Sequence, residues 1–191
     1  PLLKWTLNAN LVRTIYIDSD SSVWVGGDYG VNFTHPTRAL FEIIPPFDTD
    51  ITNRNRRMAR VVTEDNEANL WFGTFEGVVR YEPVKKYNKE FNNRPGKPQT
   101  IFYNSIRGLV TDKEGDLWIA TGRGINRYHP QTGKMDFFTE KDSIINGFFF
   151  SANKDSEGNI WFSCRDGASL YYYHSKEKKF YNIASHKTLR R

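Results

Sequence analysis

Four tryptophans recur at nearly constant spacing and constrain the fold more than any other feature of this 191-residue sequence. They stand 47, 47 and 43 positions apart, at Trp24, Trp71, Trp118 and Trp161. Each has an aspartate six residues before it and a glycine six residues after it. The aspartates are Asp18, Asp65, Asp112 and Asp155, and the glycines are Gly30, Gly77, Gly124 and Gly167. Self-similarity at a fixed period marks a repeat protein, so we expect four copies of one structural unit.

The third unit indicates what one copy builds. Short apolar runs at 106–111, 117–121, 125–128 and 134–139 are separated by segments of turn-forming residues. No unit shows a helical apolar period, which excludes ankyrin, tetratricopeptide and HEAT repeats. Four short antiparallel strands in about 45 residues are typical of a β-propeller blade. We therefore predict an all-β protein made of about four blades, each with four antiparallel strands.

The composition agrees with this fold class. Aromatic residues make up 15% of the chain and only two residues are methionine, which favours strands over helices. The charged share of 26% is ordinary and gives no support to a disordered chain. No apolar run approaches the ~20 residues of a membrane helix. The single cysteine, Cys164, cannot form an internal disulfide and is expected to be a free, buried thiol.

Two central segments resemble a known repeat. Residues 112–130 (DKEGDLWIATGRGINRYHP) and 69–83 (NLWFGTFEGVVRYEP) are similar to the two-component regulator propeller repeat. The outer units depart from it, with Phe33-Thr34 in place of Arg-Tyr and Ser163-Cys164 in place of Gly-Thr. The resemblance implies a periplasmic, bacterial sensor region of a hybrid histidine kinase that senses an oligosaccharide. It implies no enzymatic activity and no cofactor in this segment, and membrane attachment only through regions outside the sequence.

The number of strands predicts an incomplete ring. Residues 2–7 match the outermost strand of a blade, although each of the four units already has its own. We therefore expect residues 1–8 to be the outer strand of a preceding blade, followed by blades at 9–49, 50–97, 98–140 and 141–191. This arrangement is an arc of a larger propeller. A closed four-bladed ring is the alternative, because propellers have about four to eight blades.

Arginines recur at one register and mark a candidate site. Arg13, Arg60 and Arg107 stand eleven residues before the first three tryptophans, and Phe150 takes this position in the fourth unit. These positions enter the innermost strands and should share an edge with the loops that follow the second strands. The predicted ligand-binding residues are Asn10, Arg13, Tyr29, Arg57, Arg60, Asn104, Arg107 and Arg123. Guanidinium and amide groups suit carbohydrate hydroxyls and carboxylates, and a net charge of +5 favours an acidic ligand. The alternative is that the arginines bridge adjacent blades.

Other candidate sites receive less support. The repeated aspartates are interpreted as caps of tight turns and the tryptophans as packing between blades. The histidines lack metal-ligand spacing, so no metal is expected. The basic run 53–57 is too narrow for nucleic acid. The expected partners are an oligosaccharide or another small molecule and further blades of the same protein, with a homodimer left open. The competing functions are a propeller enzyme of the streptogramin lyase type and a protein-binding scaffold.

Overall fold

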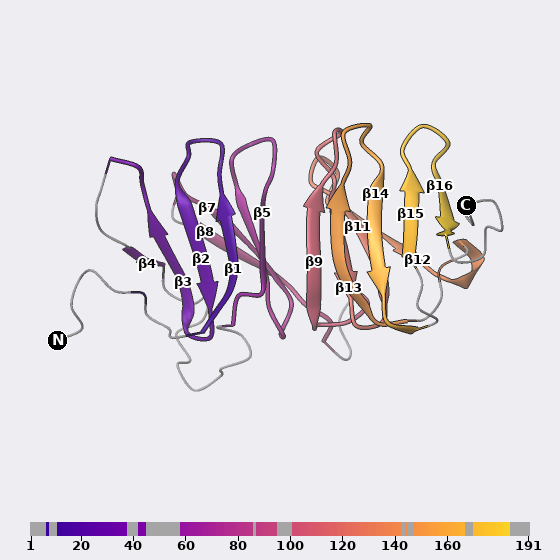
Figure 1. The fold of residues 1–191 in the computed structure, drawn as a ribbon, viewed down its shortest axis with the longest axis horizontal. Helices are drawn as coiled ribbons and strands as arrows, with labels where there is room; N and C mark the ends of the chain where they lie inside the picture. Colours follow the sequence, from indigo (N-terminus) through magenta and orange to yellow (C-terminus); the bar gives the residue numbers. More distant parts are fainter. Residues whose placement is uncertain are drawn as a thin grey trace, which may run out of the picture.

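The structure, a computed structural model, describes residues 7, 11–37, 42–44, 58–85, 87–94, 101–142, 144, 147–166 and 170–183. These residues form four antiparallel sheets of four strands, and the strands of each sheet follow sequence order (Figure 1). The first sheet contains β1 (Val12–Ile17), β2 (Val23–Gly27), β3 (Gly30–Thr34) and β4 (Glu42–Ile44). The second contains β5 (Val61–Glu64), β6 (Leu70–Gly73), β7 (Val78–Glu82) and β8 (Tyr87–Phe91).

The third and fourth sheets repeat this plan. The third contains β9 (Ile106–Thr111), β10 (Leu117–Thr121), β11 (Gly124–His129) and β12 (Lys134–Phe138), followed by a 3-10 turn, η1 (Glu140–Asp142). The fourth contains β13 (Phe149–Lys154), β14 (Ile160–Cys164), β15 (Leu170–His174) and β16 (Lys179–Asn182). The predicted all-β class with four-stranded blades is confirmed. No helix in the described part of the chain is long and apolar enough to cross a membrane.

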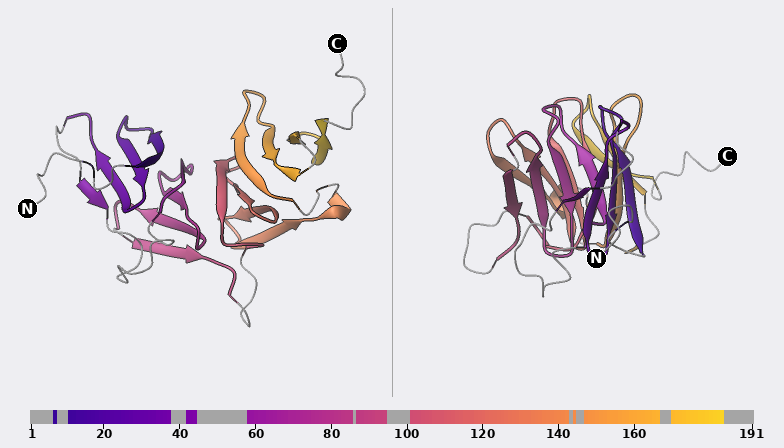
Figure 2. Two further views of the ribbon diagram at one scale, coloured as in Figure 1. Left: turned by 60° about the horizontal axis from the view of Figure 1, so that its bottom comes forward. Right: turned by 90° about the vertical axis from the view of Figure 1, so that its left-hand side faces the viewer.

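The sheets are arranged around an arc that is open on one side (Figure 2). The innermost strands β1, β5, β9 and β13 contact one another in that order. At one end of the arc, Ile15 and Ile17 of β1 remain 65% and 63% exposed. The predicted arc is therefore confirmed for the described sheets. The expected outer strand at residues 1–8 lies, apart from Leu7, outside the described residues.

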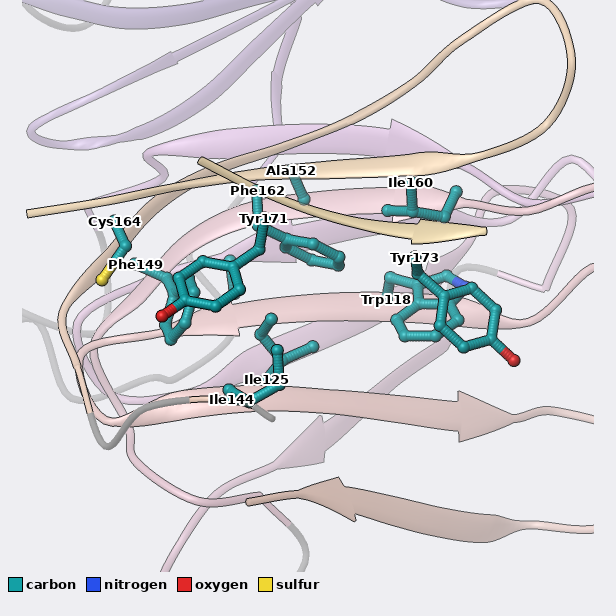
Figure 3. Packing of buried hydrophobic residues seen from close by; sticks show 11 residues of the cluster. Trp118, Ile125, Ile144, Phe149, Ala152, Ile160, Phe162, Cys164, Tyr171 and Tyr173 are labelled. Atoms are coloured by element: carbon teal, nitrogen blue, oxygen red, sulfur yellow. The ribbon is translucent and has the colours of Figure 1, made fainter. Parts of the chain in front are cut away.

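Three of the repeated tryptophans seal the joints between neighbouring sheets. Trp71 and Trp118 are fully buried, and Trp24 is nearly so. The ring of Trp71 lies 5.6 Å from that of Tyr128 in the third sheet, and the ring of Trp118 lies 4.6 Å from that of Tyr173 in the fourth. Figure 3 shows this last contact within the core of the third and fourth sheets. Aromatic contacts of this kind are strong contributors to packing.

The fourth tryptophan is less buried than the other three, which pack between blades as predicted. Trp161 is only half-buried, because no described fifth sheet packs against it. Its ring instead stacks on Tyr172 of its own sheet at 4.9 Å, and Tyr172 stacks on Tyr181 at 5.1 Å. The open end of the arc therefore carries a row of three aromatic rings.

The aspartate at the head of each first turn serves a structural role, as predicted. Asp112 accepts a hydrogen bond from the indole N–H of Trp118 at 2.8 Å and one from the backbone N–H of Asp116 at 2.9 Å. The same indole bond occurs in the other three sheets, to Asp18, Asp65 and Asp155. Burial opposes ionisation of Asp155, but hydrogen bonds from Trp161 and Asn159 outweigh it and lower the pKa of Asp155 to about 2. The carboxylates are therefore occupied by their own turns.

The lone cysteine lies in the core of the third and fourth sheets. Cys164 is free and buried, as predicted. Burial raises the pKa of its thiol. A neutral buried thiol packs as a small apolar side chain and is a poor nucleophile.

Candidate functional site

The described residues of the predicted site lie along one edge of the arc. The innermost strands begin at this edge, and the second strand of each sheet ends there, because neighbouring strands are antiparallel. It is the lower edge in Figure 1. We call it the arginine edge, after Arg13, Arg60, Arg107, Arg123 and Arg165.

Guanidinium groups and aromatic rings alternate along the arginine edge. The Cζ atom of Arg60 lies 4.4 Å from the centroid of the Phe75 ring, and that of Arg107 lies 5.7 Å from the same centroid. Arg107 also lies 4.7 Å from the ring of Phe148, over which Arg165 stands at 4.9 Å. We call this set of five residues the arginine row. It crosses the second, third and fourth sheets. The two contacts of Arg107 link its blade to both neighbours, whereas Arg60–Phe75 and Arg165–Phe148 each lie within one blade.

The arginine row concentrates positive charge. Burial, together with the charges of Arg107 and Arg13, lowers the pKa of Arg60 to about 10. Burial and the charge of Arg165 lower the pKa of Arg107. The buried Nη1 of Arg60 and the buried Nε of Arg107 have no hydrogen-bond partner among the described residues. Unpaired guanidinium N–H groups that repel one another form a local site for an anion.

The other predicted ligand-binding residues differ in whether they already have partners within the protein. Arg13 forms an ion pair with Asp28, with Nε 2.8 Å from Oδ1. Asn104 accepts a hydrogen bond from the backbone N–H of Asn93 at 2.6 Å and donates one to its carbonyl at 3.1 Å. Its amide therefore fixes the segment that follows β8. Tyr29 is 49% exposed in the turn between β2 and β3. The predicted residues Asn10 and Arg57 lie outside the described residues.

Two aromatic residues of this edge were not predicted as site residues. Phe148 lies between Arg107 and Arg165, and Tyr103 lies under Arg123, whose Cζ is 4.9 Å from the Tyr103 centroid. Gly122 lets these two rings approach, because a β-carbon there would lie 2.9 Å from Tyr103 and 3.3 Å from Phe148. The only sequence signal was the aromatic run 148–150 beside the arginine register.

A cavity of about 450 Å³ opens beside Arg123 of the arginine edge. Arg123 and Lys141 supply two cations to its wall, and Phe102 and Phe138 supply two aromatic rings. Thr139, Glu140 and Ile144 complete the described lining. A cavity of this size accommodates a small ligand. The arginine edge thus offers cations, ring faces and a hollow side by side.

The fold and part of the sequence are similar to those of known propeller proteins. The four-stranded sheets sealed by tryptophans define a segment of a β-propeller. A family model, described as the two component regulator propeller, matches residues 6–29 and 100–123. These two segments match the two-component regulator propeller repeat, in agreement with the resemblance drawn from the sequence. Among curated proteins, none matches the sequence significantly.

Solved structures agree with this assignment. The chain is similar to the extracellular domain of a hybrid two-component system from B. thetaiotaomicron, with 26% identity and a TM-score of 0.72 over 90% of this chain and 22% of that chain. It is similar to the extracellular domain of a one-component system from the same organism, with 26% identity and a TM-score of 0.69 over 86% and 22% of the two chains. The chain thus spans about a fifth of the length of these proteins.

A third structure shares the fold alone. Virginiamycin B lyase from Staphylococcus aureus is 15% identical, with a TM-score of 0.70 over 94% of this chain and 57% of that chain. Folds of this kind host unrelated activities, so a likeness at this level carries no function.

Proposed function

We propose that this chain is a ligand-sensing segment of the periplasmic ectodomain of a bacterial hybrid two-component histidine kinase, and that it binds an oligosaccharide without transforming it. Support comes from the propeller repeats and from the extracellular signalling domains to which the chain is similar. A protein-binding scaffold is the alternative, because an exposed propeller edge also suits a partner protein.

The arginine row is the observation that carries the proposal. The faces of Phe75 and Phe148 are each flanked by two guanidinium groups, from Arg60, Arg107 and Arg165. Because guanidinium groups cover these ring faces, a sugar ring would pack on an exposed ring of the same edge, such as Tyr29. A carboxylate or sulfate group accepts paired hydrogen bonds from the guanidinium groups. The ligand that satisfies both is an acidic oligosaccharide.

Signalling would follow from differential binding. The row joins residues of three sheets, so a ligand lying along it holds those sheets in one arrangement. A ligand shifts a conformational equilibrium only by the difference in its affinity for the two states. We expect the ligand-bound arrangement to be passed to further blades of the same protein and from them to the kinase.

Calorimetry on the intact ectodomain tests the proposal. Acidic and neutral oligosaccharides of equal length are titrated into the wild type and into the double variant Arg60→Ala/Arg107→Ala. We expect wild-type binding of the acidic series, weakened roughly tenfold or more in the variant, because charge-assisted hydrogen bonds contribute about 1.5 to 3 kcal/mol each. The control Lys134→Ala/Lys179→Ala removes two charges at the opposite edge and should bind normally.

Two outcomes would overturn the proposal. If the double arginine variant binds as tightly as the wild type, the site lies elsewhere. If it mainly unfolds, as judged by a large fall in melting temperature, the arginines are structural bridges between blades.

A further inference from the structure

A guanidinium group covers the buried tryptophan in the two central sheets. Arg127 pairs with Trp118 across β10 and β11, and its Cζ lies 5.0 Å from the indole. Its Nη2 atom lies 2.8 Å from Oδ2 of both Asp112 and Asp116, two of the three acidic residues of the first turn. In the second sheet, Arg80 pairs with Trp71 in the same way, 5.7 Å from its ring.

The second sheet repeats the ion pairs as well. Nη2 of Arg80 lies 3.1 Å from Oε2 of Glu67, and its Nε lies 3.8 Å from Oδ2 of Asp65. The repeat therefore contains a standard place for a guanidinium. It lies over the tryptophan, at the edge opposite the arginine edge, with turn carboxylates on one side.

The first sheet has the tryptophan and the carboxylates but lacks the arginine. Phe33 stands opposite Trp24 in β3, and the two ring centroids are 4.5 Å apart. Asp18 and Asp20 occupy the turn positions that Asp65 and Glu67 occupy in the second sheet. In the described part of the chain, neither Asp18 nor Asp20 forms an ion pair, although Asp18 accepts its usual turn hydrogen bonds.

A cavity of about 730 Å³ lies at this place, between the first and second sheets. Trp24, Phe33 and Tyr81 contribute aromatic walls. The described charged residues of the lining are five acids and two bases: Asp18, Asp20, Glu64, Glu67, Glu82, Arg80 and Lys85. The bases already pair with Glu67 and Glu82. The side that faces Asp18, Asp20 and Glu64 is therefore negative, within a chain whose net charge is +5.

We propose that this cavity is a binding site for an external guanidinium group, of the kind carried by an arginine side chain. The group lies over the Trp24–Phe33 pair and forms ion pairs with Asp18 and Asp20, as Arg127 does with its own turn in the third sheet. Carboxylates on one side and ring faces on the other favour a planar cation over a neutral ligand. The site is separate from the arginine edge and does not depend on the oligosaccharide proposal.

A pair of isosteric probes tests the site in the intact ectodomain. N-acetyl-arginine amide carries the guanidinium, whereas N-acetyl-citrulline amide has nearly the same shape and no charge. We expect saturable binding of the arginine compound by calorimetry or NMR titration, and binding of the citrulline compound that is weaker by roughly tenfold or more. Equal binding of the two probes, or binding of neither, would overturn the proposal.

Three variants locate the site. Phe33→Arg supplies the missing guanidinium from the chain itself and should abolish binding while the melting temperature is kept or raised. Asp20→Asn should weaken binding of the arginine probe several-fold, because it removes an ion pair in a partly enclosed site. The matched control Glu157→Gln makes the same charge change at the equivalent turn position of the fourth sheet and should bind as the wild type does. Wild-type binding in both Phe33→Arg and Asp20→Asn would place the guanidinium outside this cavity and overturn the proposal.

Discussion

Gly108 of β9 lies against the backbone of Ala152 in β13, so close that a β-carbon on Gly108 would stand 2.3 Å from the Ala152 nitrogen. This contact brings the innermost strands of the third and fourth sheets together. Arg107, the preceding residue in β9, is thereby held between Phe75 and Phe148. A glycine at this position thus fixes both a blade joint and the centre of the arginine row.

Gly108→Ala should destabilise the protein by about 1 to 3 kcal/mol or more, because the added methyl meets backbone rather than a side chain that can move. Chemical denaturation measures the loss. Gly133→Ala is the comparison, since a β-carbon added at Gly133 would have no other atom within 4 Å and only the left-handed backbone there, with φ of 69°, opposes the change. If Gly108→Ala cost no more than Gly133→Ala, the close approach of β9 and β13 would be wrong.

Trp118→Ala should cost about 3 to 5 kcal/mol, as expected for removing a fully buried aromatic side chain. Trp161→Ala should cost clearly less, because the indole is half-buried and stacks on a ring of its own sheet. Both variants lose the same indole-to-aspartate hydrogen bond, so the difference isolates the blade joint. Equal losses would mean that Trp161 is covered in the folded protein as Trp118 is.

The repeat made the fold of each sheet predictable from the sequence. The contacts between sheets could not be predicted in this way. The strands expected at 106–111 and 117–121 match β9 and β10, because apolar runs and turn residues are local signals. The lower burial of Trp161 could not be read from the repeat, because it depends on the sheet that follows. Phe148 was missed because its contact with Arg107 is set by the path of the chain before β13, which no periodicity reports.

Acid should weaken the fourth turn through Asp155. Its folded pKa of about 2 lies below the ordinary value of 3.8, so folding favours the ionised carboxylate. The stabilisation from this group is fully present above pH ~4 and is lost as the pH falls toward ~2. The melting temperature of Asp155→Asn should therefore lie below that of the wild type at pH 6, and the gap should narrow as the pH is lowered toward ~2. A gap that stays constant across this range would contradict the assigned hydrogen bonds.

The 191-residue chain alone should self-associate through the ends of the arc. Ile15 and Ile17 at one end, and the Trp161–Tyr172–Tyr181 row at the other, present apolar surface. Exposed apolar faces and sheet edges favour association. Light scattering should show oligomers that decrease in the variant Ile15→Lys/Ile17→Lys. A monodisperse, stable wild-type monomer would argue that the ends are covered within one chain.

Inorganic sulfate should stabilise the wild type through the arginine row. The depressed pKa of Arg60, about 10, means that its charge is less favourable in the folded protein than in the unfolded chain. An anion that accepts hydrogen bonds from Arg60 and Arg107 relieves this repulsion and binds the folded state only, so it raises the melting temperature. We expect millimolar sulfate to raise the melting temperature above that in chloride at equal ionic strength, and the increment to shrink in Arg60→Gln. Matched ionic strength and low concentration remove screening and general salt effects from the comparison.

An increment in melting temperature that is the same in Arg60→Gln as in the wild type would show that sulfate acts elsewhere. A large loss of stability in Arg60→Gln without sulfate would instead give Arg60 a structural role in packing on Phe75.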